Sequence, residues 1–219
     1  MKHHLSVAMF ALLAAICVFA APLLAQEVAQ QAPKGWKLRI DRSTSASDPD
    51  GTGDANLVTK GSGFHASSPK AAVYWNPANT ASGNYSLKST FTLMGVARHN
   101  EYYGLIFGGS DLDGAGQSYL YFMVAQDGTW LIKRREGNGT QEVSAKTASA
   151  AVKKPDASGM SANTLEVRVM AGKIDFLVNG AVVSSVPKTG QAANTDGIYG
   201  FRVNHHLEVQ VDGFALANL

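Results

Sequence analysis

The sequence is poor in cysteine. Cys17 is the only cysteine, and it lies within an apolar N-terminal run. Without a second cysteine, the chain can form no disulfide of its own and no zinc site built from several cysteines. The fold must therefore be stabilised by burial of apolar side chains, and residues 36–219 are enough to form one such core.

An excess of charge is also lacking. Lysine and arginine total 19 and aspartate and glutamate total 17, for a formal net charge of +2. Proteins that bind nucleic acid usually carry a basic patch or stripe, so this balance argues against a nucleic-acid partner. The sequence also lacks a Gly-x-Ser-x-Gly elbow, a phosphate-binding loop and a dinucleotide fingerprint, which argues against the enzymes that depend on them.

The N-terminus has the pattern of a secretory signal. Lys2 is followed by an apolar run from Leu5 to Ala21, and small residues lead to an expected cleavage after Ala25. A membrane anchor is the alternative, but the run is short for a span and is followed by Pro22 and polar residues. The pattern predicts a signal peptide over residues 1–25, a polar lead-in over 26–35, and a secreted or periplasmic protein with no membrane span after cleavage.

The remaining sequence alternates like β-strands. Residues 99–137 contain three apolar runs, YYGLIF, SYLYFMV and TWLIKRR, separated by turn-rich segments, which predicts a meander of antiparallel strands. GNYSLKSTFTLM alternates over its full length, and Asn179-Gly180 joins two further strands. DRSTSASDPDGTGD, residues 41–54, predicts a surface loop. About a dozen such strands favour one all-β domain over residues 36–219, a two-sheet antiparallel jelly-roll sandwich.

The order of these segments resembles a known fold family. "GNYSLKSTF", "YGLIFGG", "DGTWLIKRR", "NTLEVRV", "IDFLVNG" and a final "GIYGFRV" resemble the concanavalin A-like lectin/glucanase jelly roll. More narrowly, they are similar to the 3-keto-disaccharide hydrolase domain, DUF1080. The resemblance implies a carbohydrate partner, with either glycan binding or hydrolysis and elimination chemistry on a 3-keto-glycoside.

Alternation within the strands nominates residues for a sugar site on the concave sheet face. Leu120, Phe122 and Val124 suit the core, which turns the residues between them outward. Aromatic rings stack on sugar C–H groups while cationic and amide tips bind hydroxyls. The predicted ligand-binding residues are Tyr102, Tyr119, Tyr121, Lys133, Arg135, Arg202 and Asn204. The alternative is that these tyrosines are ordinary strand residues whose hydroxyls reach water.

Candidate catalytic groups are few. The Glu-x-Asp-x-x-Glu string of laminarinase-type sandwich enzymes is absent, which argues against a glucanase of that kind. His99 and Glu101 are two residues apart and would share one face of an extended chain. If the family resemblance holds, these two are the first candidates for metal ligand and catalytic base. The alternative is two polar residues at a strand entrance.

Two segments suggest metal ligands. Asp111 and Asp113 precede a glycine and resemble half of a calcium loop, which makes Ca²⁺ a candidate ligand here without establishing a cofactor; a plain Asp-Gly turn is the alternative. His205 and His206 are adjacent, and on a strand they would point to opposite faces and could not bind one ion together. The sequence as a whole predicts an exported carbohydrate-active domain. A non-catalytic structural or protein-interaction domain of the cell envelope is the alternative.

Overall fold

The computed structural model describes residues 33–43 and 45–219. The predicted signal peptide, residues 1–25, and most of the predicted lead-in lie outside these residues. Within the described ranges, no helix is long and apolar enough to cross a membrane. The described helical structure is a single 3₁₀ turn, η1 (Gly190–Ala192), and the other regular elements are strands.

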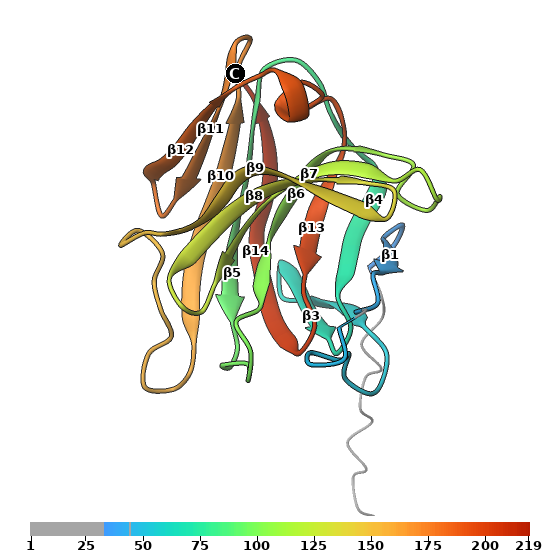
Figure 1. The fold of residues 1–219 in the computed structure, drawn as a ribbon, viewed down its shortest axis with the longest axis vertical. Helices are drawn as coiled ribbons and strands as arrows, with labels where there is room; N and C mark the ends of the chain where they lie inside the picture. Colours follow the sequence, from blue (N-terminus) through green and yellow to red (C-terminus); the bar gives the residue numbers. More distant parts are fainter. Residues whose placement is uncertain (1–32, 44) are drawn as a thin grey trace, which may run out of the picture.

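Fourteen strands form two antiparallel sheets of seven strands each, as predicted. Sheet A contains, in spatial order, β1 (Lys37–Ile40), β4 (Ala72–Ala81), β13 (Gly197–Val203), β6 (Tyr102–Ser110), β7 (Ser118–Ala125), β8 (Thr129–Glu136) and β9 (Gly139–Ala148). Sheet B contains β12 (Ala181–Pro187), β11 (Lys173–Val178), β10 (Ser161–Val169), β5 (Tyr85–Leu93), β14 (Leu207–Asn218), β3 (Gly63–Ser68) and β2 (Asn56–Lys60). In Figure 1, β6 to β9 cross in front of β5, β10 and β14.

The predicted meander is confirmed. Strands β6, β7 and β8 are neighbours in sheet A, with Leu105 opposite Phe122 and Phe122 opposite Ile132. The last two strands of the chain instead enter the middle of the sheets. Strand β13 lies between β4 and β6, and β14 lies between β5 and β3.

The core lies between the two sheets and is built from alternate residues of the strands. Leu120, Phe122 and Val124 of β7 are fully buried in it, as the alternation predicts. Phe122 packs against the rings of Trp130 and Phe176, with centroid distances of 6.4 and 5.2 Å. Large rings of this kind supply the apolar burial on which a domain without disulfides depends.

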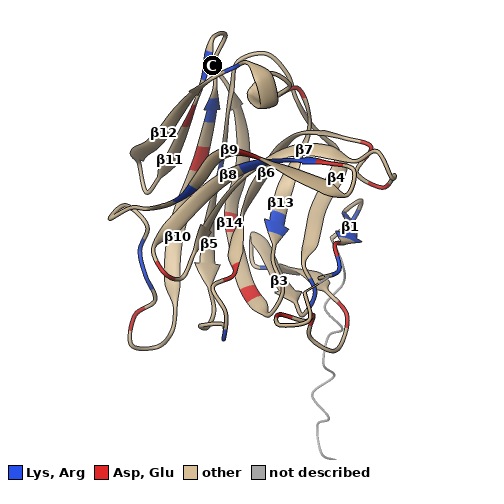
Figure 2. Cartoon of the chain, viewed as in Figure 1, with Lys and Arg blue, Asp and Glu red and all other residues tan. Residues whose placement is uncertain are grey.

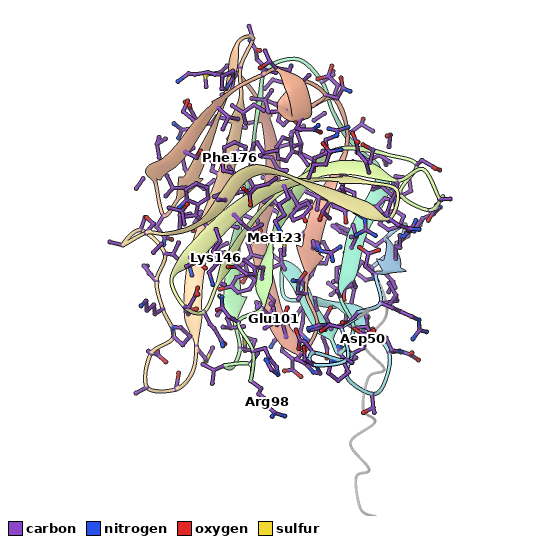
Figure 3. The ribbon with its side chains drawn as sticks, viewed as in Figure 1. Asp50, Arg98, Glu101, Met123, Lys146 and Phe176 are labelled. Carbon is purple, nitrogen blue, oxygen red and sulfur yellow. The ribbon has the colours of Figure 1, made fainter. Side chains whose placement is uncertain are left out.

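The outer face of sheet A, which points away from sheet B, carries a second apolar cluster. Its members are Val73, Trp75, Ile106, Leu112, Tyr119, Tyr121, Met123 and Leu131. Tyr119, Tyr121 and Met123 alternate with the core residues of β7, so their predicted outward direction is confirmed. Figure 3 labels Met123 on this face and Phe176 in the core. This face is therefore packed over part of its area and positions the polar side chains described next.

Candidate functional site

A cavity of about 720 Å³ opens beside the end of β1, on the outer face of sheet A. Its walls come from β1 and the following loop, from β13 and from the β8–β9 hairpin. The lining residues are Arg39, Ile40, Asp41, Arg42, Ser43, Ala71, Arg135, Asn138, Arg202, Asn204 and His205. Three of the predicted ligand-binding residues, Arg135, Arg202 and Asn204, are among them. Figure 2 shows the basic residues of β1 and β13 in this region.

Asp41 occupies the centre of the charged wall, directly after β1. Nη1 of Arg202 donates a hydrogen bond to Oδ2 of Asp41. Two further guanidinium groups approach Oδ1, Nε of Arg39 at 3.5 Å and Nη2 of Arg135 at 3.9 Å. Burial alone would raise the pKa of Asp41, but the guanidinium groups, Arg202 foremost, outweigh it and lower the pKa. The Asp41 carboxylate is thus the shared partner of three arginine side chains.

The cavity has an excess of positive charge. Four of its lining residues are arginines and one is an aspartate, so with His205 neutral its formal charge is +3. The whole chain carries only +2. Positive charge concentrated in a concave site raises the local concentration of anions and favours ligands that carry negative charge.

Tyr119 and Tyr121 pack beside Arg202 but are not among the residues that line the cavity. The Tyr119 ring is fully buried, and its hydroxyl accepts a hydrogen bond from Nη1 of Arg202 at 2.9 Å. Tyr121 is 8% exposed, and the Arg202 guanidinium lies 5.9 Å from its ring centroid. Burial raises the pKa of Tyr121 to about 12. These rings therefore position Arg202, and Tyr119 has no exposed surface with which to contact a ligand.

Four predicted ligand-binding residues lie outside the cavity lining: Tyr119 and Tyr121, described above, and Tyr102 and Lys133. The Tyr102 hydroxyl is 2.9 Å from Oγ1 of Thr129, and Nζ of Lys146 lies 6.0 Å from its ring centroid. Lys133 is partly exposed on β8, two residues before Arg135. The structure therefore brings together the arginine and asparagine candidates, while Tyr102 and Lys133 lie elsewhere on the same sheet.

A second polar cluster surrounds His205, in the turn between β13 and β14 at the edge of the cavity. Its Nε2 atom lies 3.0 Å from Oε1 of Glu101 and 3.1 Å from Oδ2 of Asp48, and its Nδ1 atom lies 3.3 Å from Oδ1 of Asp50. Nε2 of His99 lies 3.8 Å from Oδ1 of Asp48. Both predicted catalytic residues, His99 and Glu101, therefore belong to this cluster, and their catalytic role stays a prediction.

Burial and the neighbouring charges raise or lower the pKa values of the groups in this cluster. Burial raises the pKa of Glu101. Burial alone would lower the pKa of His205, but Glu101, Asp48 and Asp50 outweigh it and raise the pKa. Burial would raise the pKa of Asp48, yet hydrogen bonding to His205 lowers it. Glu101 therefore holds a proton more readily than an ordinary glutamate, while Asp48 stays ionised.

The expectation that His205 and His206 point to opposite faces is wrong. It assumed extended backbone, but both residues lie in a turn, and His206 has a left-handed φ of 60°. Their rings consequently lie side by side, with centroids 4.9 Å apart. Donor atoms of Asp48, His205 and His206 all lie within 4.8 Å of one another. The turn thus allows an arrangement that a strand would forbid.

Asp111 and Asp113 of the β6–β7 loop contact different partners. Oδ2 of Asp111 accepts a hydrogen bond from the Gly116 amide at 2.9 Å, which stabilises the turn. Asp113 instead forms an exposed ion pair with Lys37, with 2.6 Å between Nζ and Oδ2. Each carboxylate thus has a local partner, an arrangement typical of a plain Asp-Gly turn. Bound Ca²⁺ at this loop stays a prediction.

Sequence patterns missed several residues of both clusters. Residues 41–54 predict only a surface loop, yet this loop supplies Asp41 to the cavity and Asp48 and Asp50 to the His205 cluster. Asp48-Pro49-Asp50 has the same alternating acids as Asp111 to Asp113. The alternating acids could have indicated a polar site in this loop. Their partner His205, however, lies more than 150 residues away in the sequence.

Comparisons with known proteins identify the fold and no family. No protein-family model matches the chain, and no curated protein matches it. The structure of the carbohydrate binding module CBM66 from Bacillus subtilis matches with a TM-score of 0.58 and 8% identity, covering 84% of this chain and 96% of that one. A Bacillus subtilis protein of unknown function with a galectin-like fold matches with a TM-score of 0.57 and 15% identity, covering 84% and 90%.

A third match is the exoplasmic/lumenal domain of VIP36 with bound Ca²⁺ and Man3GlcNAc. Its TM-score is 0.54 at 11% identity, and the match covers 84% of each chain. At such low identities these matches establish a shared fold. They confirm the predicted concanavalin A-like jelly-roll sandwich, whereas the resemblance to the 3-keto-disaccharide hydrolase domain stays a prediction.

Proposed function

We propose that this domain binds carbohydrate in the arginine-lined cavity on the outer face of sheet A. The cavity itself carries the proposal, because it combines guanidinium and amide donors, the groups that bind sugar hydroxyls, and its Arg202 is held in place by Tyr119 and Tyr121. Arg135 and Asn138 of the β8–β9 hairpin line it together with Arg202 of β13 and Asn204, which directly follows β13. Two fold neighbours are named as a carbohydrate binding module and as a domain bound to Man3GlcNAc, which supports this class of ligand.

The charge of the cavity favours an acidic sugar. Asp41 neutralises one of the four arginines, and the remaining excess of positive charge suits a carboxylate. Guanidinium groups bind carboxylates through paired hydrogen bonds, and a hydrogen bond to a charged group contributes about 1.5–3 kcal/mol. We therefore propose a uronic acid residue as the preferred ligand. The predicted signal peptide would export the domain to where such polysaccharides occur.

Binding is best measured by isothermal titration with oligogalacturonate, a neutral gluco-oligosaccharide and a sulfated oligosaccharide. We expect oligogalacturonate to bind tightest and Arg135→Ala to weaken it about tenfold or more, as the loss of at least 1.4 kcal/mol predicts. Arg168→Ala on β10 is a matched control, since Arg168 pairs with Glu166 on sheet B. Preference for the sulfated ligand would reject the uronate, and binding of no sugar would favour the envelope protein-interaction domain.

Chemistry on a 3-keto-glycoside is a second candidate, favoured by the raised pKa of Glu101 beside the cavity-lining His205. A carboxyl with a raised pKa is suited to general acid–base catalysis. In this proposal Glu101 is the base, and His99, which approaches Asp48, is a metal ligand. Glu101→Gln should abolish turnover of a 3-keto-glucoside if the proposal holds. Turnover equal to that of the unmodified protein would exclude Glu101 from the reaction.

A further inference from the structure

The His205 cluster contains more negative than positive charge. Three carboxylates, Asp48, Asp50 and Glu101, lie within 3.3 Å of one imidazole. The side chains of His205, Glu101 and Asp50 are 9%, 8% and 14% exposed. Among the residues that the structure describes, the ion pairs of these carboxylates involve only histidines. A single imidazolium can balance only one of three carboxylates, and unbalanced buried charge is costly.

The two nitrogens of His205 face different kinds of partner. Nδ1 lies 3.3 Å from Oδ1 of Asp50, so with a proton on Nδ1 it donates to this carboxylate. Nε2 then presents a lone pair toward Oδ2 of Asp48 and Oε1 of Glu101. A carboxylate that orients the far nitrogen of a histidine is the usual outer partner of a metal-bound imidazole.

Two distances within the cluster match those between ligands around one small ion, and the ligand atoms of Asp48, His205 and His206 all lie within 4.8 Å of one another. Ligand atoms about 2.0–2.1 Å from a tetrahedral zinc ion lie about 3.3 Å apart. Nε2 of His205 lies 3.0 and 3.1 Å from the oxygens of Glu101 and Asp48. His206 adds a second imidazole, because its left-handed backbone turns it beside His205. In addition, Oδ1 of Asp48 is buried without a hydrogen-bond partner.

We propose that Asp48, His205 and His206 bind a divalent transition metal ion, with Asp50 orienting His205. Two imidazoles with a carboxylate favour Zn²⁺ over Ca²⁺, since Ca²⁺ is bound almost entirely by oxygen. Figure 3 shows Glu101 and Asp50 at the same end of the molecule, where the β13–β14 turn meets the loop after β1. The site adjoins the sugar cavity but does not depend on sugar binding.

The test is isothermal titration of the chelator-treated full chain with ZnCl₂ and, separately, with CaCl₂. We expect one equivalent of Zn²⁺ to bind at micromolar concentration or below and Ca²⁺ to bind at least 100-fold more weakly. His206→Gln, at an exposed position, and Asp48→Asn should each weaken Zn²⁺ binding at least tenfold. His65→Gln on β3 is a matched control that should leave it unchanged. Co²⁺ in place of zinc should give the visible absorption of a tetrahedral site.

Three results would overturn the proposal: no stoichiometric zinc binding, zinc binding that survives both His206→Gln and Asp48→Asn, or tighter binding of Ca²⁺ than of Zn²⁺. His205→Asn should also lose zinc, but its side chain is nearly buried and the variant could unfold. His206→Gln and Asp48→Asn keep the test valid in that case, because both positions are more exposed. Uronate titration in the presence of chelator tests the sugar site separately, so failure of one proposal leaves the other measurable.

Discussion

Replacement of Asp41 by asparagine tests the charged wall of the cavity directly. The Asp41 and Arg202 side chains are 7% and 12% exposed, so their ion pair is largely shielded from water. Asp41→Asn removes the negative charge and leaves Arg202 buried among Arg39 and Arg135. Removing one partner of a buried pair costs about 3–5 kcal/mol. At roughly 2–4 °C per kcal/mol for a domain of this size, we expect a fall in Tm of about 6–20 °C.

The effect of this substitution should depend on pH in a defined direction. The pKa of Asp41 is lower in the folded protein than in the unfolded chain, where it is near 3.8. The ionised carboxylate therefore stabilises the fold at all pH values above about 4, and this contribution is lost as pH falls through the lower, folded-state pKa. The unmodified protein and Asp41→Asn should differ in stability by a constant amount from pH 7 to pH 5 and converge in strong acid.

Urea unfolding followed by circular dichroism at pH 7, 5 and 3 measures both effects. Asp113→Asn is the appropriate control, because Asp113 and Lys37 are 61% and 48% exposed and such pairs contribute about 0–1 kcal/mol. If Asp41→Asn were as stable as the unmodified protein at pH 7, the assigned role of Asp41 would be refuted. A loss of stability that stayed unchanged down to pH 3 would also contradict it.

Three further predictions concern the core, sheet A and the β6–β7 loop. Phe122→Ala should lower the free energy of unfolding by about 3–5 kcal/mol in urea titration, since its ring is fully buried; a loss below 1 kcal/mol would contradict this. Gly104→Ala should destabilise by at least about 1–3 kcal/mol, because its Cβ would lie 2.2 Å from the Phe122 carbonyl oxygen; thermal melting would show it. Asp111→Asn should leave the response of Tm to added Ca²⁺ unchanged. If the substitution abolished a response that the unmodified protein shows, the result would support a calcium-binding loop at this position.

The strands could be predicted because their signal is local. In β7 the alternation of Leu120, Phe122 and Val124 with Tyr119 and Tyr121 gives both the strand and the direction of its side chains, and the structure confirms both. Each strand has one face to bury, so two stacked sheets follow from the pattern itself. The same reasoning correctly placed Arg135 and Arg202 on the outer face.

The polar clusters could not be predicted in the same way, because they join distant parts of the chain. Asp41 and Arg202 are 161 residues apart in sequence, and Asp48 and His205 are 157 apart. Residues 41–54 have no alternation from which the direction of a side chain could be inferred. For His205 and His206 the prediction used the rule that successive side chains of a strand point to opposite faces. These two residues form a turn instead, and their rings lie side by side.

The positions of β13 and β14 affect the order in which the protein can be assembled. Until residues 197–203 have been synthesised, β4 and β6 have no strand to join them, and sheet A exists as two separate halves. Sheet B is likewise in two parts until β14 is made, because β14 lies between β5 and β3 and pairs with both. Pairing over such long sequence separations is slow. During synthesis, therefore, neither the cavity nor the His205 cluster can form before residues 202–205 are made.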